Sequence, residues 1–331
     1  MVLPIDIARS FSSGQPFAVF RLPGDTTIRV ADSDNEFHIN MWNTPFSSNI
    51  SVNECSSGLA AVQPWAESTP HDRYINSTHQ LIGRLRSRGG KCVRMRAICA
   101  SGKTFDINAI VEDVFNLYPD AFCHCYYTPH TGLWLGATPE LLLDYDGKTM
   151  RTMSLAGTRS ADRSGQWDEK NKQEQAFVTE FICESLTKLG LQPHCGIDET
   201  LRYGAIEHIC TRIEAALKPG IVLEDILNAL SPTPAVAGLP RCDSLAEIEK
   251  IEDAPRRCYA GYVMYRGGGG QVKAYVNLRC AQFSENAYCI YAGGGVTAES
   301  DAESEWSETS AKGASLVDIF ERNTIDDEPQ Q

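Results

Sequence analysis

The sequence predicts a fold that combines α-helices with β-strands. Several segments alternate apolar and polar residues or read as hairpins, which is typical of strands, and two stretches carry side chains of one kind at helical spacing. Of the 331 residues, 42% are hydrophobic and 22% are charged, as in ordinary globular domains. This length favours about two domains and also allows one large α/β or α+β domain.

Charge and hydropathy exclude several classes of function. The formal net charge of −13 argues against a nucleic-acid binder and against a protein held on an anionic membrane. It is compatible with a small anionic substrate, because a few local cations or a bound metal can override the global field. No apolar run reaches the roughly 18 residues of a membrane span, and the N-terminus lacks the pattern of a signal peptide. We therefore expect a cytoplasmic protein.

The twelve cysteines are scattered and include no Cys-x-x-Cys pair. Cys123, His124 and Cys125 form the one tight cluster in the sequence, and without a second cluster it makes a poor zinc site. We expect buried or idle thiols in a reducing compartment.

Short strand-like runs mark the N-terminal part of the chain. Residues 17–20 and 27–30 read as strands, and the polar stretch around 56–76 is a candidate boundary. From there the pattern of elements is dense to about residue 320. The acidic end, DDEPQQ, reads as a frayed tail.

Two of the predicted strands bring a charged residue next to apolar ones. Residues 91–100 alternate like a strand, and Lys91 begins its apolar face. Residues 132–143 predict a strand, a turn at Pro139 and a further apolar run, with Glu140 at the turn.

Residues 168–189 predict an amphipathic helix that ends at Gly190. Glu174 stands at the head of the apolar stripe, so its carboxylate should face the interior or a cleft. The stripe consists of Phe177, Val178, Phe181, Ile182, Leu186 and Leu189.

The C-terminal third predicts a hairpin and then a helix. Strands over 273–283 and 287–291 flank a turn at 284–286, and Tyr275, Asn277 and Arg279 share one face of the first strand. The second strand runs into three glycines, 293–295. A helix that begins near Ser300 carries Glu305, Glu308 and Lys312 on one face.

Each of these charged residues has a functional and an ordinary interpretation. Three glutamates from two helices suit a hard cation such as Mg²⁺, whereas a solvated acidic face would look the same. Arg279 in an uncharged strand could bind a carboxylate or phosphate, or form an internal salt bridge. Lys91 could be a desolvated general base or a snorkelling surface lysine, and Glu140 an acid of raised pKa or an exposed carboxylate. The glycines at 293–295 could admit an anion to backbone N–H groups, or form a loose turn.

Read together, the segments resemble the chorismate-utilising enzymes, which include isochorismate synthases, salicylate synthases and the large subunits of anthranilate and aminodeoxychorismate synthases. Nine blocks occur in the family's order between residues 80 and 320. They are GKCVRMR (90–96), LGATPELLL (135–143), SLAGTRS (154–160), EKNKQEQAFV (169–178), IEHICT (206–211), SPTPAVAGLPR (231–241), RRCYAGYV (256–263), VNLRCA (276–281) and YAGGGVTAESDAESEWSETSAKGASL (291–316).

Within this family, the block PTPAVAGLPR followed by YAGY is most similar to the menaquinone-type isochorismate synthases. Ala235 and Val236 stand where that type has an alanine and a small aliphatic residue. The sequence contains no glutaminase segment. The resemblance therefore implies an enzyme that interconverts chorismate and isochorismate without a glutaminase subunit, acting as a monomer, for menaquinone biosynthesis.

The resemblance also implies roles for individual residues. Lys91 would activate water for attack at carbon 2 of chorismate, and Glu140 would protonate the hydroxyl that leaves carbon 4. Glu174, Glu305 and Glu308 would hold Mg²⁺, which binds the ring carboxylate. The expected substrate contacts are Gly157, Thr158, His208, Ala235, Val236, Tyr259, Arg279, Gly294 and Lys312.

The implied fold is a single α+β domain of two large, mostly antiparallel sheets stacked together, with helices outside. Residues 1–70 match the family poorly and are expected to be a strand-rich segment that packs on the main body. Residues 71–322 form the catalytic region, and residues 323–331 a disordered acidic tail.

The chain departs from the family pattern at Arg94, three residues after the proposed base. Alternatives to an isochorismate synthase are a salicylate synthase, an aminating chorismate enzyme or a non-catalytic binding paralogue.

Overall fold

The structure is a computed structural model that describes residues 2–162, 165–204 and 206–325. Two antiparallel sheets of eight strands each form its centre. In spatial order the first sheet consists of β13 (Gly238–Leu239), β5 (Lys91–Ser101), β17 (Ala287–Val296), β16 (Cys280–Phe283), β8 (Gly132–Thr138), β7 (Phe122–Thr128), β1 (Phe17–Arg21) and β2 (Arg29–Val30). The second consists of β11 (His194–Tyr203), β12 (Ile206–Ala216), β10 (Thr149–Ser160), β9 (Leu141–Tyr145), β15 (Val272–Val276), β14 (Tyr262–Gly267), β3 (Asn35–Asn40) and β4 (Ile50–Ser51).

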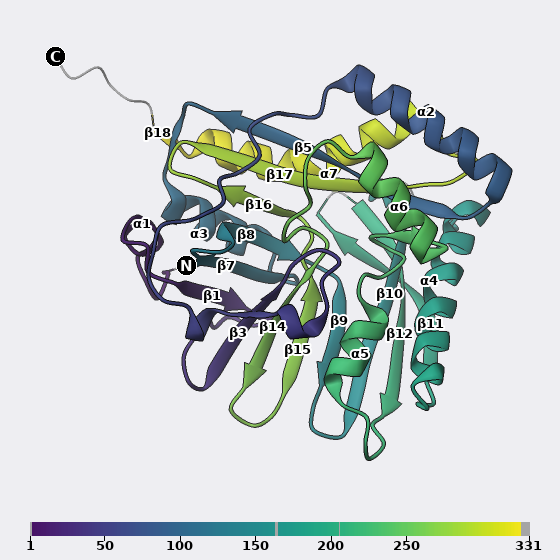
Figure 1. Ribbon diagram of the computed structural model, residues 1–331, viewed down its shortest axis with the longest axis horizontal. Helices are drawn as coiled ribbons and strands as arrows, with labels where there is room; N and C mark the ends of the chain where they lie inside the picture. Colours follow the sequence, from purple (N-terminus) through teal and green to yellow (C-terminus); the bar gives the residue numbers. More distant parts are fainter. Residues whose placement is uncertain (1, 163–164, 205, 326–331) are drawn as a thin grey trace.

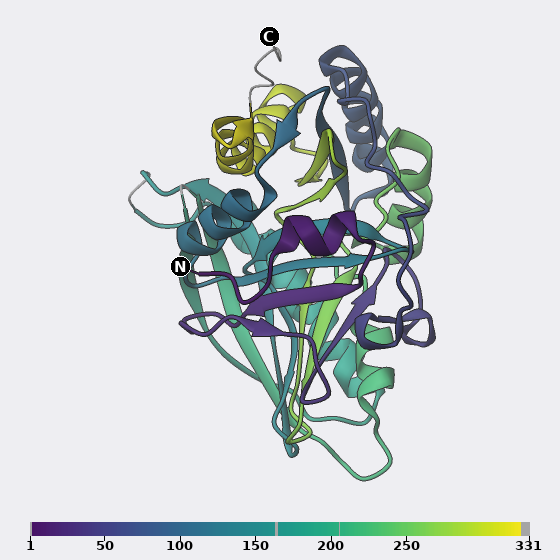
Figure 2. The same cartoon turned by 90° about the vertical axis from the view of Figure 1, so that its left-hand side faces the viewer.

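Helices surround the two sheets. They are α1 (Ile7–Ser12), α2 (His71–Arg88), α3 (Ile107–Leu117), α4 (Glu169–Lys188), α5 (Leu223–Leu230), α6 (Arg241–Ile251) and α7 (Ala302–Arg322), with short 3-10 turns η1 (Phe46–Ser48) and η2 (Val52–Glu54). Strands of the first sheet run crosswise to those of the second, and α2 and α7 lie over the first sheet near β5 and β17 (Figure 1). The same crossed arrangement is visible from the side (Figure 2).

One hydrophobic core lies between the sheets and a second covers the other face of the first sheet. Phe20 and Phe37, whose ring centroids are 5.4 Å apart, belong to the first core. Helices α1, α3 and α7 supply the second, for example through Val114 and Phe320. Because a core packs on each face of the first sheet, every residue of β7 and β8 is buried. Removing the apolar side chains of these strands from water stabilises the fold.

Aspartate caps determine where the helices near the site begin. Asp168 accepts a hydrogen bond from the backbone N of Asn171 at the start of α4, and Asp301 from that of Ser304 at the start of α7. Such caps satisfy N–H groups that have no partner inside the helix. The predicted helices at 168–189 and near Ser300 are thus confirmed.

The fold class expected from the resemblance is confirmed: two stacked antiparallel sheets with outer helices form one α+β domain. The N-terminal segment contributes strands to both sheets, since β1 and β2 lie in the first and β3 and β4 in the second. At the other end, β18 (Thr324–Ile325) pairs with β6 (Thr104–Phe105), so this part of the expected tail is ordered. Residues 326–331 of that tail lie outside the described residues.

The expected strand over 273–283 is wrong, because the chain changes sheets within it. Residues 272–276 form β15 in the second sheet, and residues 280–283 form β16 in the first. Between them Arg279 adopts a φ of 47°, which no strand residue has. Tyr275, Asn277 and Arg279 therefore do not share a strand face.

Two smaller expectations also fail. Helical spacing predicts Phe177 on the apolar stripe of α4, but its side chain is 39% exposed and Gln175 is buried instead. The Gln175 side chain donates to Ser154 and Thr211, so hydrogen bonding satisfies this polar group in the interior. The glycines 293–295 lie inside β17 rather than in a loose turn.

The cysteines are free thiols throughout the described chain, and most of them are buried. Within the same residues, no helix is both long enough and apolar enough to cross a membrane.

Candidate active site

A pocket lies where the two sheets, α4 and α7 meet. It is lined by side chains from both sheets and from both helices. All the sequence-predicted residues except Gly294 and Glu305 line it: Lys91, Glu140, Gly157, Thr158, Glu174, His208, Ala235, Val236, Tyr259, Arg279, Glu308 and Lys312. These residues come from nine separate segments of the chain, so their meeting is a property of the tertiary structure.

Lys91 and Glu174 form an ion pair inside the pocket. The Lys91 Nζ atom donates to Glu174 Oε1 at 2.6 Å, and the lysine is only 3% exposed. Burial would raise the pKa of Glu174, but the charges of Lys91, Lys312 and Lys170 lower it below its ordinary value. The snorkelling interpretation of Lys91 is therefore wrong, since its amine points into the site.

Gly295 of β17 makes room for this ion pair. A Cβ atom at this position would lie 2.6 Å from Lys91 Cε and 3.0 Å from Glu174 Oε1. At Gly293 a Cβ atom would lie 2.5 Å from the Tyr259 hydroxyl. The glycine run thus allows side chains from both sides of the pocket to approach the strand.

Glu140 lies at the turn between β8 and β9, where it is 3% exposed. Burial raises the pKa of Glu140 to about 7, although Thr233 and Lys91 act in the opposite direction. The Thr233 hydroxyl donates to Glu140 Oε1 at 3.2 Å. A carboxyl group with this pKa can hold or release a proton near neutral pH.

Glu305 and Glu308 approach the pocket from α7. Burial and the neighbouring Glu308 raise the pKa of Glu305 to about 7. The Ser300 hydroxyl donates to Glu305 Oε1 at 2.7 Å, while Oε2 is buried without a partner among the described residues. Lys312 donates to Glu308 Oε1 at 2.7 Å and to the Gly293 carbonyl at 2.9 Å.

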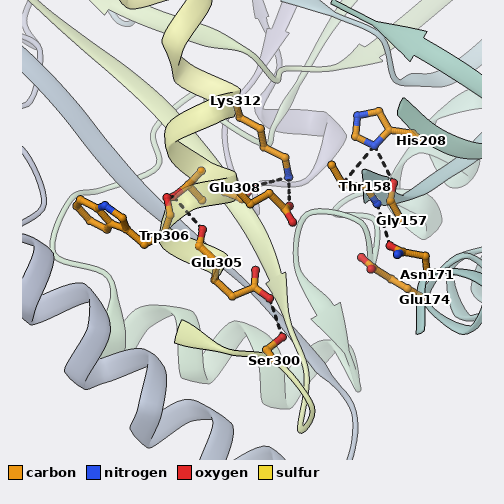
Figure 3. Close-up of polar contacts among 12 residues, drawn as sticks. Gly157, Thr158, Asn171, Glu174, His208, Ser300, Glu305, Trp306, Glu308 and Lys312 are labelled. Carbon is orange, nitrogen blue, oxygen red and sulfur yellow. Dashed lines mark hydrogen bonds and ion pairs between the residues drawn. The ribbon is translucent and has the colours of Figure 1, made fainter. Parts of the chain in front are cut away.

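The donor set suits a hard divalent cation. Figure 3 shows the carboxylates of Glu174, Glu305 and Glu308 directed toward the space between α4 and α7. Oxygen ligands of this kind are those that Mg²⁺ prefers, and the partnerless Glu305 oxygen is a buried acceptor that a cation would satisfy. Among the residues that the structure describes, no three His, Cys, Asp or Glu side chains lie together in metal-binding geometry. Lysines are paired with Glu174 and Glu308, so a cation would have to replace them.

His208 connects two sides of the pocket. Its Nδ1 atom lies 2.9 Å from the Gly157 carbonyl, so Nδ1 carries the proton and donates, and Nε2 accepts from Arg279 at 3.2 Å. Burial, with the charges of Arg279 and Lys312, lowers the pKa of His208 to about 3. The imidazole is therefore neutral at physiological pH. Gly157 has a φ of 67°, which lets the backbone turn toward the ring.

Arg279 is held by the edge of the second sheet. Its guanidinium donates to the Tyr203 carbonyl at 3.4 Å as well as to His208. No carboxylate partner is found for it in the described chain, so the internal salt bridge considered from the sequence is not formed. Its charge is thus available to an anion in the pocket. Tyr259 lines the same pocket and stacks on Tyr291 with centroids 5.8 Å apart.

Arg94 and Arg96 project from the opposite face of β5 to Lys91. Arg94 stacks on Tyr74 at 4.1 Å and donates to Thr78, so it does not reach the proposed base. Arg96 lies 3.6 Å over the Trp306 ring and donates to Thr309 and Ser310. All three partners belong to the turns of α7 that carry Glu305 and Glu308, so Arg96 attaches the acidic face to the sheet.

Sequence reasoning missed several polar residues that support the site. Thr233, whose hydroxyl donates to Glu140, lies two residues before Ala235, and its position in the sequence does not indicate this contact. Asn171 accepts from the Thr158 backbone N at 3.0 Å, and nothing in its helical position signals this contact. Gly293 and Gly295, rather than Gly294, face the pocket, since Gly294 faces Glu305 on the α7 side.

The chain matches the family of chorismate binding enzymes over residues 45–321, and it belongs to that family. Isochorismate synthase MenF of Pasteurella multocida (strain Pm70) is 32% identical over 207 residues, 58% of this chain and 48% of the relative. Isochorismate synthase MenF of Escherichia coli (strain K12) is 34% identical over 217 residues, 60% of this chain and 48% of the relative. The chain thus spans about half the length of these two curated relatives.

A solved structure shows the same fold. The menaquinone-specific isochorismate synthase MenF from Escherichia coli superposes with a TM-score of 0.79 at 22% identity, covering 96% of this chain and 92% of that one. At this level of identity the likeness supports the fold alone.

Proposed function

We propose that this protein is an isochorismate synthase that interconverts chorismate and isochorismate in a Mg²⁺-dependent reaction. Water adds at ring carbon 2, and the hydroxyl at carbon 4 leaves. The observation that carries the proposal is that one pocket contains a buried amine, Lys91, and a separate buried carboxyl group, Glu140. The sequence identity of 32% and 34% to two isochorismate synthases supports the proposal.

The two groups suit opposite proton transfers. Glu140, with a pKa of about 7, retains a proton near neutral pH and can donate it to the departing hydroxyl. Lys91 must be neutral to take a proton from water. Its Nζ atom donates to Glu174 Oε1, so a cation that occupied Glu174 would displace this contact and leave the amine free to face the substrate. Each group can contribute about 10²–10⁴-fold to the rate.

The electrostatics of the pocket suit a dianion. Arg279 and Lys312 supply positive charge on one side, and Glu174, Glu305 and Glu308 would bind Mg²⁺ on the other. A bound Mg²⁺ would neutralise the ring carboxylate and orient the ring. Neutral His208 accepts from Arg279 and so orients that guanidinium toward a substrate carboxylate.

The pathway that we propose for this enzyme is inferred from the names of its relatives. Both curated relatives carry the name MenF, and one structural neighbour is described as menaquinone-specific, which supports a role in menaquinone biosynthesis. We further propose a cytoplasmic enzyme that acts as a monomer without a glutaminase subunit.

The test is product analysis by chromatography after incubation with chorismate, with Mg²⁺ and with EDTA. We expect isochorismate with Mg²⁺ and none with EDTA, and Lys91→Ala should lose turnover. Salicylate and pyruvate as main products would instead indicate a lyase, and an ammonium-dependent product an aminating enzyme. Chorismate binding without turnover in excess Mg²⁺ would indicate a non-catalytic paralogue.

A further inference from the structure

Two cysteines outside the pocket lie in contact at the end of α4. The Sγ atoms of Cys183, in the last turns of α4, and Cys195, the second residue of β11, are 3.0 Å apart. This is closer than ordinary sulfur contact and about 1 Å longer than a disulfide bond. The two residues flank the connection between helix and strand, so they are neighbours in sequence as well as in space.

We propose that Cys183 and Cys195 form a reversible oxidative modification site. A low-molecular-weight disulfide such as glutathione disulfide oxidises the two thiols to an intramolecular disulfide. The pair is reduced in a reducing compartment and cross-linked when the pool of such disulfides rises. This inference does not depend on the proposed catalytic activity.

The backbone around Cys195 can supply the remaining movement. The strand β11 is the edge of the second sheet, and its residues are exposed along most of their length. Its register with β12 shifts between Cys195 and Asp198, so a bulge lies beside the cysteine. Edge strands with bulges adjust at low cost, and the sulfurs need to approach by only about 1 Å.

The exposure of the two thiols sets the order of events. Cys195 is exposed, so its thiolate attacks one sulfur of glutathione disulfide, forming a mixed disulfide and releasing one glutathione. The Cys183 thiolate then attacks the Cys195 sulfur and releases the second glutathione. The two thiols lose two protons and two electrons, and glutathione disulfide is reduced to two glutathione molecules. Burial and the adjacent Cys195 raise the pKa of Cys183, which disfavours it as the first attacking thiol; its attack on the mixed disulfide depends on the 3.0 Å distance between the two sulfurs.

Other cysteines in the described chain provide comparisons. Cys99 and Cys289 are paired directly across β5 and β17, but Cys289 is fully buried and shielded from a soluble oxidant. Cys242 is exposed at the start of α6 and can accept glutathione. These positions separate the effects of proximity and accessibility within one molecule.

The cross-link would join α4 to the edge of the sheet. Glu174 and Asn171, which contact the pocket residues Lys91 and Thr158, lie on the same helix. Closing this short loop restricts the unfolded chain, so the oxidised protein should be more stable than the reduced one.

The experiment is treatment of the purified protein with glutathione disulfide, then alkylation, trypsin digestion and mass spectrometry. Cleavage after Lys172, Lys188 and Arg202 places the two cysteines in separate peptides, 173–188 and 189–202. We expect these peptides to appear cross-linked. The melting temperature of the oxidised protein should be a few degrees higher than that of the reduced protein and should fall back when the disulfide is reduced. Cys183→Ser should leave Cys195 with a bound glutathione, and the matched control Cys242→Ser should still form the cross-link.

The proposal is overturned if both peptides remain alkylated while Cys242 in the same sample carries glutathione. It is equally overturned if Cys195 of the wild type keeps its bound glutathione without cross-linking, links to a second protein molecule or pairs with a different cysteine. Cys195→Ser, at an exposed position, provides a second variant should Cys183→Ser fold poorly. In this variant the cross-linked peptide and the rise in melting temperature must both disappear.

Discussion

The buried carboxyl group of Glu140 should cost stability as well as serve the reaction. Its pKa is about 7 against an ordinary value of 4.5, so the folded protein binds this proton more tightly than the unfolded chain. Stability therefore falls as the pH rises from about 4.5 to 7 and is constant above. At about 1.4 kcal/mol for each pKa unit, the loss above pH 7 amounts to about 3 kcal/mol.

Glu140→Gln removes the charge and keeps an acceptor for the Thr233 hydroxyl. We expect the variant to be more stable than the wild type by about 3 kcal/mol at pH 8 and by less than about 1 kcal/mol at pH 5. Turnover should fall at least 100-fold, because an amide cannot donate a carboxyl proton.

The assay is urea unfolding of both proteins across pH 5 to pH 8.5, with the midpoint converted to a free energy of unfolding. Glu285→Gln, which changes an exposed glutamate in the turn between β16 and β17, is the matched control. Equal stability of wild type and Glu140→Gln at pH 8 would refute the reasoning, since it would mean that Glu140 is not penalised by burial.

Three further changes test residues next to the proposed acid, the proposed base and the proposed metal ligands. Thr233→Val removes a hydrogen bond to the carboxylate and should raise the pKa of the proposed acid by about 1, so the alkaline fall of kcat/KM should move to higher pH; an unchanged pH profile would contradict this. Gly295→Ala should cost at least about 100-fold in kcat by displacing Lys91, whereas Gly269→Ala, with no atom within 4 Å of the new methyl, should be neutral; thermal unfolding checks that both fold. Arg96→Met should raise the Mg²⁺ concentration for half-maximal rate about tenfold, with a smaller change in the KM for chorismate at saturating Mg²⁺. Equal changes in both constants would mean that Arg96 does not position α7.

Local patterns predicted the elements that carry the site. Alternation placed Lys91 on an inward face, and helical spacing placed Glu174 at the head of a buried stripe and Glu305 and Glu308 on one turn. The structure shows each of these placements, because residue spacing and the two periodicities decide which side chains share a face.

Patterns failed where tertiary contacts override local preference. The apolar run at 273–283 reads as one strand, yet Arg279 breaks it and each half joins a different sheet. Phe177 matches the stripe of α4, but Gln175 occupies the interior because Ser154 and Thr211 bind its amide. Local periodicity contains no information about these distant partners.

The sequence by itself determined the family, through nine ordered blocks, and the identities and local faces of the charged residues. Only the tertiary structure decided that Lys91 pairs with Glu174, that burial raises the pKa of Glu140 to about 7, and that Gly295 rather than Gly294 faces the pocket. Spacing along the chain determines which neighbours share a face. Ion pairing and desolvation depend on what other segments place within a few ångströms, and that is decided by folding.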